Sequence, residues 1–112
     1  MTSNSLNSNN VVLACFGQSL SRRMVAIPIR KGIETALHVD SEVVIDFEGV
    51  EATQSFVDEL VGVLIVKDGP GVLKKIRFKR CSSTMKAIVK FVVADRTDQF
   101  MRTLGKNMEL SS

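Results

Sequence analysis

The stretch that decides the fold is VIDFEGVEATQSFVDEL, which runs from Val44 to Leu60. An apolar run ends in an acidic turn, passes through Thr-Gln-Ser and resumes with apolar residues at helical spacing. A β-branched run of this kind favours a buried strand, whereas Phe56, Leu60 and Leu64 repeat with the period of one helix face. The stretch therefore predicts a strand, a loop and a helix, and its acids and hydroxyls make the loop a candidate functional site.

The strand of this junction is predicted over Glu42–Phe47, and its nearly continuous apolar run is typical of a strand that is covered on both faces. Asp46 at its end is expected to brace the loop that follows. Ser55 is the expected N-cap of the helix. Asp58 and Glu59 fall in the first turn, where carboxylates stabilise the positive end of the helix dipole. The acids and the hydroxyl thus suit the start of a helix as well as a site.

Outside the junction, the same periodicities predict further strands and helices. Pro28 lies inside the first helix and is expected to bend it, because proline removes a backbone hydrogen bond. In the last strand, alternation points Ile76 and Phe78 inward and the basic residues between them outward. The predicted elements are a strand at Val11–Phe16, a helix at Arg22–Leu37 capped by Ser21, a turn at Lys67–Gly71, a strand within Leu73–Arg80, and a helix from Ser82 or Ser83 to Arg96 that either continues toward Leu104 or is followed by a short terminal helix.

Strands and helices alternate along the chain, which favours a small α/β layer with partly parallel strands. At 112 residues, with 45% hydrophobic and 24% charged residues, the sequence is that of one ordinary globular domain. The predicted division is a flexible polar tail over residues 1–10, a domain over 11–104 and a frayed tail over 105–112.

Several classes of protein are disfavoured by composition. The apolar runs are interrupted by charges and are too short to span a bilayer, and no leader opens the chain, so a cytoplasmic protein is expected. Cys15 and Cys81 lack the spacing of metal ligands, and His38 is the only histidine. We therefore expect reduced thiols, no metal site and no cofactor.

The run VVIDFEGVEATQSFVDELVG, followed by IRFK and then by MKAIVKFVV, resembles the STAS-like domain family of unknown function. Members of that family are relatives of the anti-sigma factor antagonists of bacteria. The resemblance extends from Phe16 to Arg96, and its most specific part is DFEGVE followed by SF-x-DEL. It implies a mixed sheet of about four strands with helices packed against it. It also implies a protein-interaction module in regulation and signalling rather than an enzyme.

In the antagonists, a serine at the start of the corresponding helix is phosphorylated by a partner that is an ATP-binding, histidine-kinase-like protein. The unmodified form sequesters this partner, and the phosphate breaks the complex, which is called partner switching. In the present sequence the antagonists' aspartate-serine-serine segment falls on Gln54, Ser55 and Phe56. The aspartate has no counterpart, and the usual phosphoacceptor falls nearest Phe56. The candidate phosphoacceptors are therefore Ser55, one position earlier, and Thr53 in the loop.

A partner-binding surface is accordingly predicted at the junction. Gly49 is expected to let the backbone turn closely, and Phe56 is expected to anchor the helix from below. A phosphate carries a charge of about −2 and would repel the acids of the first helical turn, which suits a disruptor of a docked partner. Helix capping is the simpler role of Ser55. The predicted surface consists of Glu48, Gly49, Glu51, Thr53, Gln54, Ser55, Asp58 and Glu59.

Two alternatives belong to other classes of protein. A small basic nucleic-acid-binding regulator would use Lys75, Arg77 and Lys79, but the net charge is only +3 and there is no Tyr or Trp to stack on bases. A solvated strand face that blunts edge pairing is the plainer reading of these cations. An enzyme would use Asp46 and Glu48, which have no base or metal partner nearby in sequence. We therefore expect no enzymatic activity, and two sheet edges leave a homodimer open.

Overall fold

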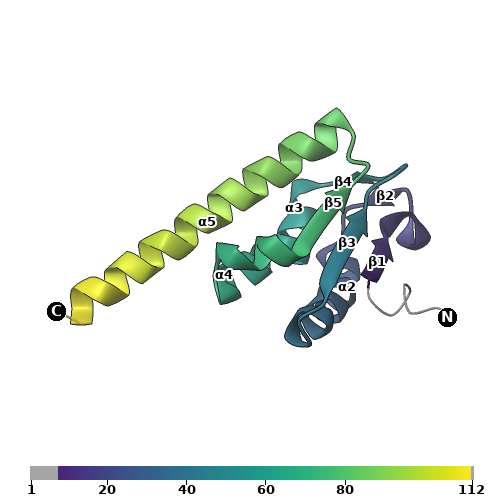
Figure 1. Cartoon of the computed structure of the whole chain (residues 1–112). Coiled ribbons are helices and arrows are strands. Elements are labelled where there is room, and N and C mark those ends of the chain that lie inside the picture. Colours follow the sequence, from purple (N-terminus) through teal and green to yellow (C-terminus); the bar gives the residue numbers. More distant parts are fainter. Residues whose placement is uncertain (1–7, 112) are drawn as a thin grey trace.

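Two small parallel sheets and a set of helices make up the structure, a computed structural model that describes residues 8–111 (Figure 1). No helix in this range is both long and apolar enough to cross a membrane. The elements in chain order are β1 (Ser8–Val12), the 3-10 helix η1 (Leu13–Phe16), β2 (Ser19–Leu20), α2 (Arg23–His38), β3 (Glu42–Asp46), β4 (Glu51–Ala52), α3 (Gln54–Val57), the π-helical turn η2 (Asp58–Gly62), α4 (Val63–Asp68), the 3-10 helix η3 (Pro70–Lys75), β5 (Ile76–Lys79) and α5 (Ser83–Ser111).

The strands form two separate sheets. One has the order β1-β3-β5, and the other pairs β2 with β4. Every pairing is parallel. The predicted α/β class is confirmed, but the mixed sheet of about four strands is not exact, because the described residues form sheets of three and two strands with parallel pairing. Parallel neighbours require a crossover between them, and α2 and the α3–α4 segment supply the crossovers on either side of β3.

The core lies between the larger sheet and the helices. Val43 and Ile45 of β3 are completely buried in one cluster with residues of α2, α3, α4 and α5. The opposite face of the sheet is more open, because Val44 is only half-buried and its neighbour Arg77 on β5 is exposed. The prediction that β3 is covered on both faces is therefore wrong for Val44, and the helices pack on the Val43 side.

The N-terminal strand differs from its prediction in position. The register pairs Ser8 with Glu42 and Val12 with Asp46, where β3 ends. Beyond Val12 the chain has no strand to pair with, and Leu13–Phe16 forms a 3-10 turn instead of continuing the predicted strand. The predicted polar tail of residues 1–10 thus overlaps β1 by residues 8–10, and residues 1–7 lie outside the described residues.

Helix α2 agrees with its predicted range to within one residue at each end, and Pro28 lies inside it. The predicted cap is wrong. Arg22, not Ser21, occupies the N-cap position, and no side chain there bonds the helix start. The basic strand β5 is shorter than its predicted range because η3 occupies Pro70–Lys75, within the predicted turn and the start of the predicted strand.

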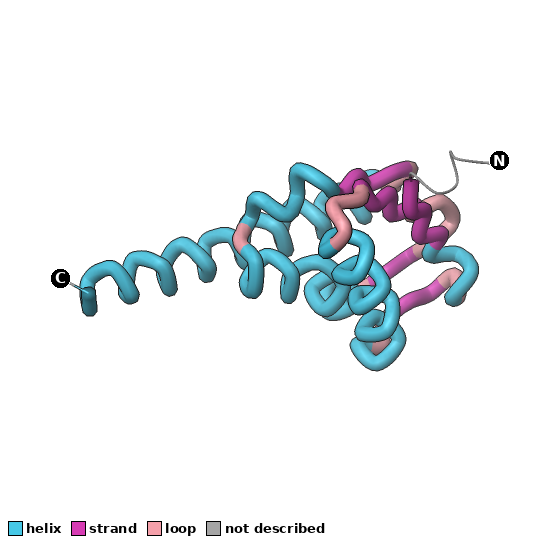
Figure 2. The backbone as a smooth tube through the Cα atoms, turned by 60° about the horizontal axis from the view of Figure 1, so that its bottom comes forward, coloured by secondary structure: helices cyan, strands magenta, loops and turns pink. Residues whose placement is uncertain are grey.

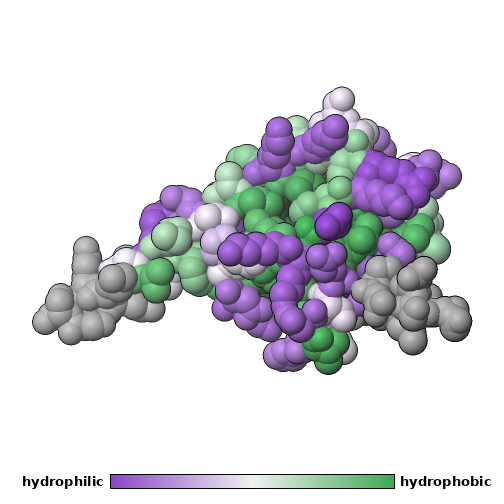
Figure 3. Space-filling model, viewed as in Figure 1, coloured by the Kyte–Doolittle hydropathy of each residue, from purple (hydrophilic) through white to green (hydrophobic). Residues whose placement is uncertain are grey.

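Helix α5 is one continuous helix. The Ser82 hydroxyl accepts a hydrogen bond from Met85 N at 3.1 Å, which confirms Ser82 as its predicted cap. The helix runs through Ser111, so the predicted frayed tail of 105–112 is helical up to that residue. Its first half packs on α3 and α4, and the Phe100 ring of its second half lies beside Gly69. The C-terminal end of the helix extends away from the body (Figures 1 and 2). Where α5 passes β5, apolar side chains remain visible between hydrophilic ones (Figure 3).

Candidate functional site

The loop after β3 is held by Asp46 at the end of the strand and by Arg80 after β5. Asp46 is buried, and its Oδ1 accepts a hydrogen bond from Glu48 N at 3.0 Å, as expected of a strand-end aspartate that braces a loop. Arg80 contacts both acids, with Nη2 3.4 Å from Asp46 Oδ2 and Nη1 2.8 Å from Glu48 Oε1. Gly49 has a φ of +71°, a conformation that L residues other than glycine rarely adopt. The loop backbone is therefore well fixed.

The helix after the loop begins two residues earlier than a cap at Ser55 would allow. Thr53 is the N-cap, and its Oγ1 accepts a hydrogen bond from Phe56 N at 3.2 Å. The prediction that Ser55 caps this helix is wrong. Ser55 instead lies at the second helical position with an exposed side chain. Phe56 is fully buried beneath it, which confirms its predicted role as the anchor of the helix.

The predicted partner-binding residues fall into two groups. Asp58 and Glu59 are largely covered, with side chains 13% and 15% exposed, and both face neighbouring helices. The other residues are all exposed and lie on the loop, on β4 and at the start of α3. We call this second group the junction surface; it consists of Glu48, Gly49, Glu51, Thr53, Gln54 and Ser55.

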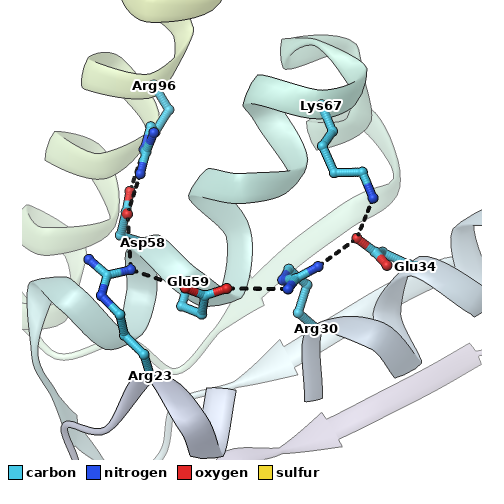
Figure 4. A network of polar contacts seen from close by, with 7 residues as sticks. All are labelled: Arg23, Arg30, Glu34, Asp58, Glu59, Lys67 and Arg96. Atoms are coloured by element: carbon cyan, nitrogen blue, oxygen red, sulfur yellow. Dashed lines mark hydrogen bonds and ion pairs between the residues drawn. The ribbon is translucent and has the colours of Figure 1, made fainter. Parts of the chain in front are cut away.

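The covered acids belong to a chain of ion pairs between helices (Figure 4). Arg96 of α5 binds Asp58 through two hydrogen bonds, from Nε to Oδ1 at 2.6 Å and from Nη2 to Oδ2 at 2.5 Å. Arg23 of α2 donates from Nη1 to Asp58 Oδ2 at 3.4 Å and to Glu59 Oε1 at 3.2 Å. The two acids of η2 thus connect α5 with α2.

The chain of contacts continues along α2 to α4. Arg30 Nη2 donates to Glu59 Oε2 at 3.2 Å, and Arg30 Nη1 donates to Glu34 Oε2 at 2.9 Å. Lys67 of α4 completes it with a hydrogen bond from Nζ to the same Glu34 oxygen at 3.2 Å. We call the set the helix network; it consists of Arg23, Arg30, Glu34, Asp58, Glu59, Lys67 and Arg96.

Charge pairing changes the acidity of these groups. The hydrogen bonds from Arg96 lower the pKa of Asp58, against the opposing effect of burial. Asp58 in return raises the pKa of Arg96. Burial raises the pKa of Glu34, but the contacts with Lys67 and Arg30 together outweigh it and leave this pKa lowered. All of these shifts favour the charged forms, so the helix network is a structural set of ion pairs.

Sequence reasoning singled out Asp58 and Glu59 of the helix network. It missed Glu34, the basic partners of these acids and the glycine that makes room for them. Gly62 lies in η2, and a Cβ added there would collide with the Asp58 carboxylate and lie 3.1 Å from Arg96 Cγ. The π-helical turn η2 marks this place as unusual, since such turns are rare and often occur at functional sites. Nothing in the local sequence pattern indicated it.

The cations of the nucleic-acid hypothesis lie on β5 and at the end of η3, directly before it. Arg77 and Lys79 share one face of β5, as the alternation predicted, while Lys75 pairs with Asp40 and Arg77 Nε lies 3.6 Å from Glu42 Oε1. Cys15 and Cys81 are free cysteines. Burial raises the pKa of the Cys81 thiol. In the part of the chain that the structure describes, no group of three or more His, Cys, Asp or Glu side chains is placed to hold a metal ion.

The family model described as the STAS-like domain of unknown function (DUF4325) matches residues 25–86. This range includes α2 without its first two residues, β3, the junction surface, η2 and β5. No curated protein and no solved structure matches the chain.

Proposed function

The chain belongs to the family of STAS-like domains of unknown function, and on this premise we propose that it is a non-catalytic regulatory module that binds a protein partner through the junction surface. The proposal rests on the division of the predicted partner-binding residues into a covered group and an exposed group. The acids that would have suggested chemistry, Asp58 and Glu59, are paired with arginines. The residues left exposed all lie within residues 48–55, where only Val50 and Ala52 are buried.

A docking surface binds well when it is already in its bound shape, because less conformational entropy is then lost on binding. Three contacts fix the shape of the junction surface. Asp46 holds the backbone of Glu48, Thr53 caps α3, and Phe56 is buried underneath. The exposed polar groups above this support are carboxylates, a carboxamide and hydroxyls. They suit hydrogen bonding and charge pairing with a partner that presents basic or polar groups.

The resemblance to anti-sigma factor antagonists supplies the class of partner, an ATP-binding protein of the histidine-kinase-like class. We propose that Ser55 is the residue at which such a partner switches the module. Its side chain is exposed, whereas the Thr53 hydroxyl is engaged in the helix cap. A phosphate on Ser55 would add a charge of about −2 in the middle of the junction surface and would alter the fit of a docked partner.

Affinity purification from the native host tests the surface. We expect the wild type and the variant Asp68→Lys to recover the same ATP-binding protein, and we expect Glu51→Lys to lose it. Glu51 and Asp68 are both exposed acids outside the described ion pairs, so the two variants change the net charge equally and differ in position. Equal recovery by all three proteins would refute the junction surface as the binding site.

Incubation of the purified module with that partner and ATP tests the switch. We expect one phosphate on Ser55 in mass spectra of the wild type, the same product from Thr53→Ala, and none from Ser55→Ala. A phosphate on Thr53, or none at all in the presence of a partner that binds, would remove the switch and leave the binding module.

A further inference from the structure

The strand β5 lies at the edge of the larger sheet. It pairs with β3 on one side, and within residues 8–111 no strand pairs with its other side. Lys79 O accepts a hydrogen bond from Phe47 N at 2.9 Å, so the backbone polar groups of Lys79 point toward β3. Neighbouring residues of a strand point their backbone groups in opposite directions. The N–H and C=O groups of Phe78 therefore point away from β3, to the open side.

A hollow of about 310 Å³ lies beside this open edge, between the end of β5 and the first turns of α5. Phe78, Cys81 and Val89 give it an apolar lining, and Val89 belongs to the buried core. Arg80, Lys86 and Lys90 complete the lining. The same region is visible in Figure 3 as an apolar area bordered by hydrophilic side chains.

The charges around the hollow are positive, and several of them have no partner. Among the described residues, Lys79, Lys86 and Lys90 form no ion pair, whereas Arg80 contacts Asp46 and Glu48. The remaining cation of β5, Arg77, has a long contact with Glu42 and is largely exposed. Arg77 and Lys79 point to one face of the strand, and Ile76 and Phe78 point to the other face, toward the helices.

We propose that the open edge of β5 and this hollow bind an extended acidic segment of a partner protein, in which acidic and apolar residues alternate. Such a segment would add a strand to the sheet beside β5, with hydrogen bonds to the free backbone groups of Phe78. Its apolar side chains would point toward the hollow beside Phe78 and Val89. Its carboxylates would point to the other face, next to Arg77 and Lys79.

Two other occupants, a second copy of the chain and a nucleic acid, fit this edge less well. A second copy of the chain would bring the Arg77 and Lys79 side chains of both copies close together, and like charges on adjacent strands are destabilising. A nucleic acid would find the cations, but the aromatic residue in the lining of the hollow is Phe78, which is partly covered and offers little face for a base to stack on. An acidic peptide strand satisfies the cations, the apolar hollow and the free backbone groups together. This inference goes beyond the junction surface and does not depend on it.

The probe is a fluorescein-labelled peptide of about eight residues, alternating glutamate and valine, which is long enough to span β5. The comparison probes are a lysine-valine peptide, a glutamate-serine peptide and a labelled oligothymidylate. Fluorescence anisotropy of the full chain with each probe measures affinity. We expect the glutamate-valine peptide to bind at least roughly 10-fold more tightly than the other three, because only it matches both the charge and the hollow.

Charge-reversing variants locate the site. We expect Arg77→Glu and Lys79→Glu each to weaken the binding of the glutamate-valine peptide by roughly 3- to 10-fold. The control is Lys31→Glu on α2, an exposed lysine without an ion pair in the described structure that lines a different hollow; it changes the net charge equally and should leave the affinity within roughly 2-fold. Hydrogen exchange adds a backbone readout, since the Phe78 amide should exchange more slowly when the peptide is bound.

Three results would overturn the proposal. The first is equal affinity for the glutamate-valine and lysine-valine peptides, or no binding of either. The second is tighter binding of oligothymidylate, which would assign the cations to nucleic acid. The third is a concentration-dependent dimer, seen by sedimentation, that Lys79→Glu alters and that protects the Phe78 amide without any peptide. If none of the probes binds and the chain stays monomeric, the lysines serve only to prevent edge pairing.

Discussion

The junction surface and two acids of the helix network, Asp58 and Glu59, lie on one short piece of chain, yet their surroundings differ. Glu48 and Glu51 are exposed, and their loop and strand point them to solvent. Asp58 lies one helical turn after Ser55 and meets Arg96 from a helix 38 residues away in sequence. Glu48 is also reached by a base, Arg80, but its side chain remains 67% exposed, whereas that of Asp58 is 13% exposed. The difference teaches that coverage by other helices, and not an ion pair alone, separates the acids on the two sides of Phe56.

The largest loss of stability is expected from filling the space beside Asp58 and Arg96. Gly62→Ala places a Cβ against the Asp58 carboxylate and Arg96 Cγ, and η2 is buried between helices. We expect the free energy of unfolding to fall by about 2–3 kcal/mol, because overpacking forces the ion pair or the helices apart. Urea denaturation followed by circular dichroism measures this change.

A matched substitution at Gly32 serves as the control for that experiment. Gly32 lies in the interior of α2, and a Cβ added there meets nothing within 4 Å. Alanine has the higher helix propensity, so Gly32→Ala should stabilise the protein by up to about 1 kcal/mol. If both glycine variants behave alike, the space around Asp58 and Arg96 is not what Gly62 provides.

The second effect concerns the ion pair itself and depends on pH. Asp58→Asn removes the charge that Arg96 binds, and we expect a loss of about 1–2 kcal/mol in the free energy of unfolding at pH 7. The pKa of Asp58 is lower in the folded protein than its ordinary value of 3.8. The contribution of its charge is therefore complete above that value and is lost as the pH falls through the lower folded value.

The difference in unfolding free energy between wild type and Asp58→Asn should accordingly stay constant from about pH 7 to about pH 5 and shrink below about pH 4. Denaturation series at several pH values measure it. A difference that grows on acidification would contradict the lowered pKa.

The third effect distinguishes the contributions of the Thr53 and Ser55 hydroxyls to stability. Thr53→Ala removes the cap of α3 and should cost about 1 kcal/mol in the free energy of unfolding. Ser55→Ala should change it by less than about 0.5 kcal/mol, because the side chain is exposed. Thermal and urea denaturation of both variants give the comparison. The reverse order would mean that Ser55 caps the helix after all.

The smallest effect is expected for the exposed acids. Glu51→Gln should leave the free energy of unfolding within about 0.5 kcal/mol of the wild type, since exposed charges contribute little. Its effect should instead appear in the binding of a partner. A loss of stability similar to that of Asp58→Asn would show that the two regions do not differ as we describe.

The parts of the fold that could be predicted are those with a strong local pattern. β3, α2 and the cap of α5 at Ser82 followed from period and capping residues close together in sequence. The end of β1 at Val12 could not be predicted in this way, because it depends on where its partner β3 ends. The separation of the strands into two sheets likewise depends on which strands pair with one another, and that is not read from a local pattern.

In the candidate site, too, only the features with a local pattern could be predicted. The exposed residues of the loop follow from a strand that stops at an aspartate and a helix that starts soon after it. The position of the cap was missed by two residues, since Thr53 and Ser55 are both good caps and only the backbone decides between them. The partners of Asp58 and Glu59 come from α2 and α5, and hydrophobic periodicity carries no information on such pairs.

The position of Arg96 has a mechanical consequence. It lies near the middle of α5, so the helix reaches roughly 20 Å to either side of it at 1.5 Å per residue. The arm toward Ser83 is fixed in the core by Met85, Val89 and Val92. On the other arm, the Phe100 ring lies beside Gly69. The helix therefore behaves as a beam that is clamped along its N-terminal half, with the Asp58–Arg96 contact as one more fixed point near its middle. Any bending is expected in the C-terminal end, which extends from the body (Figure 1).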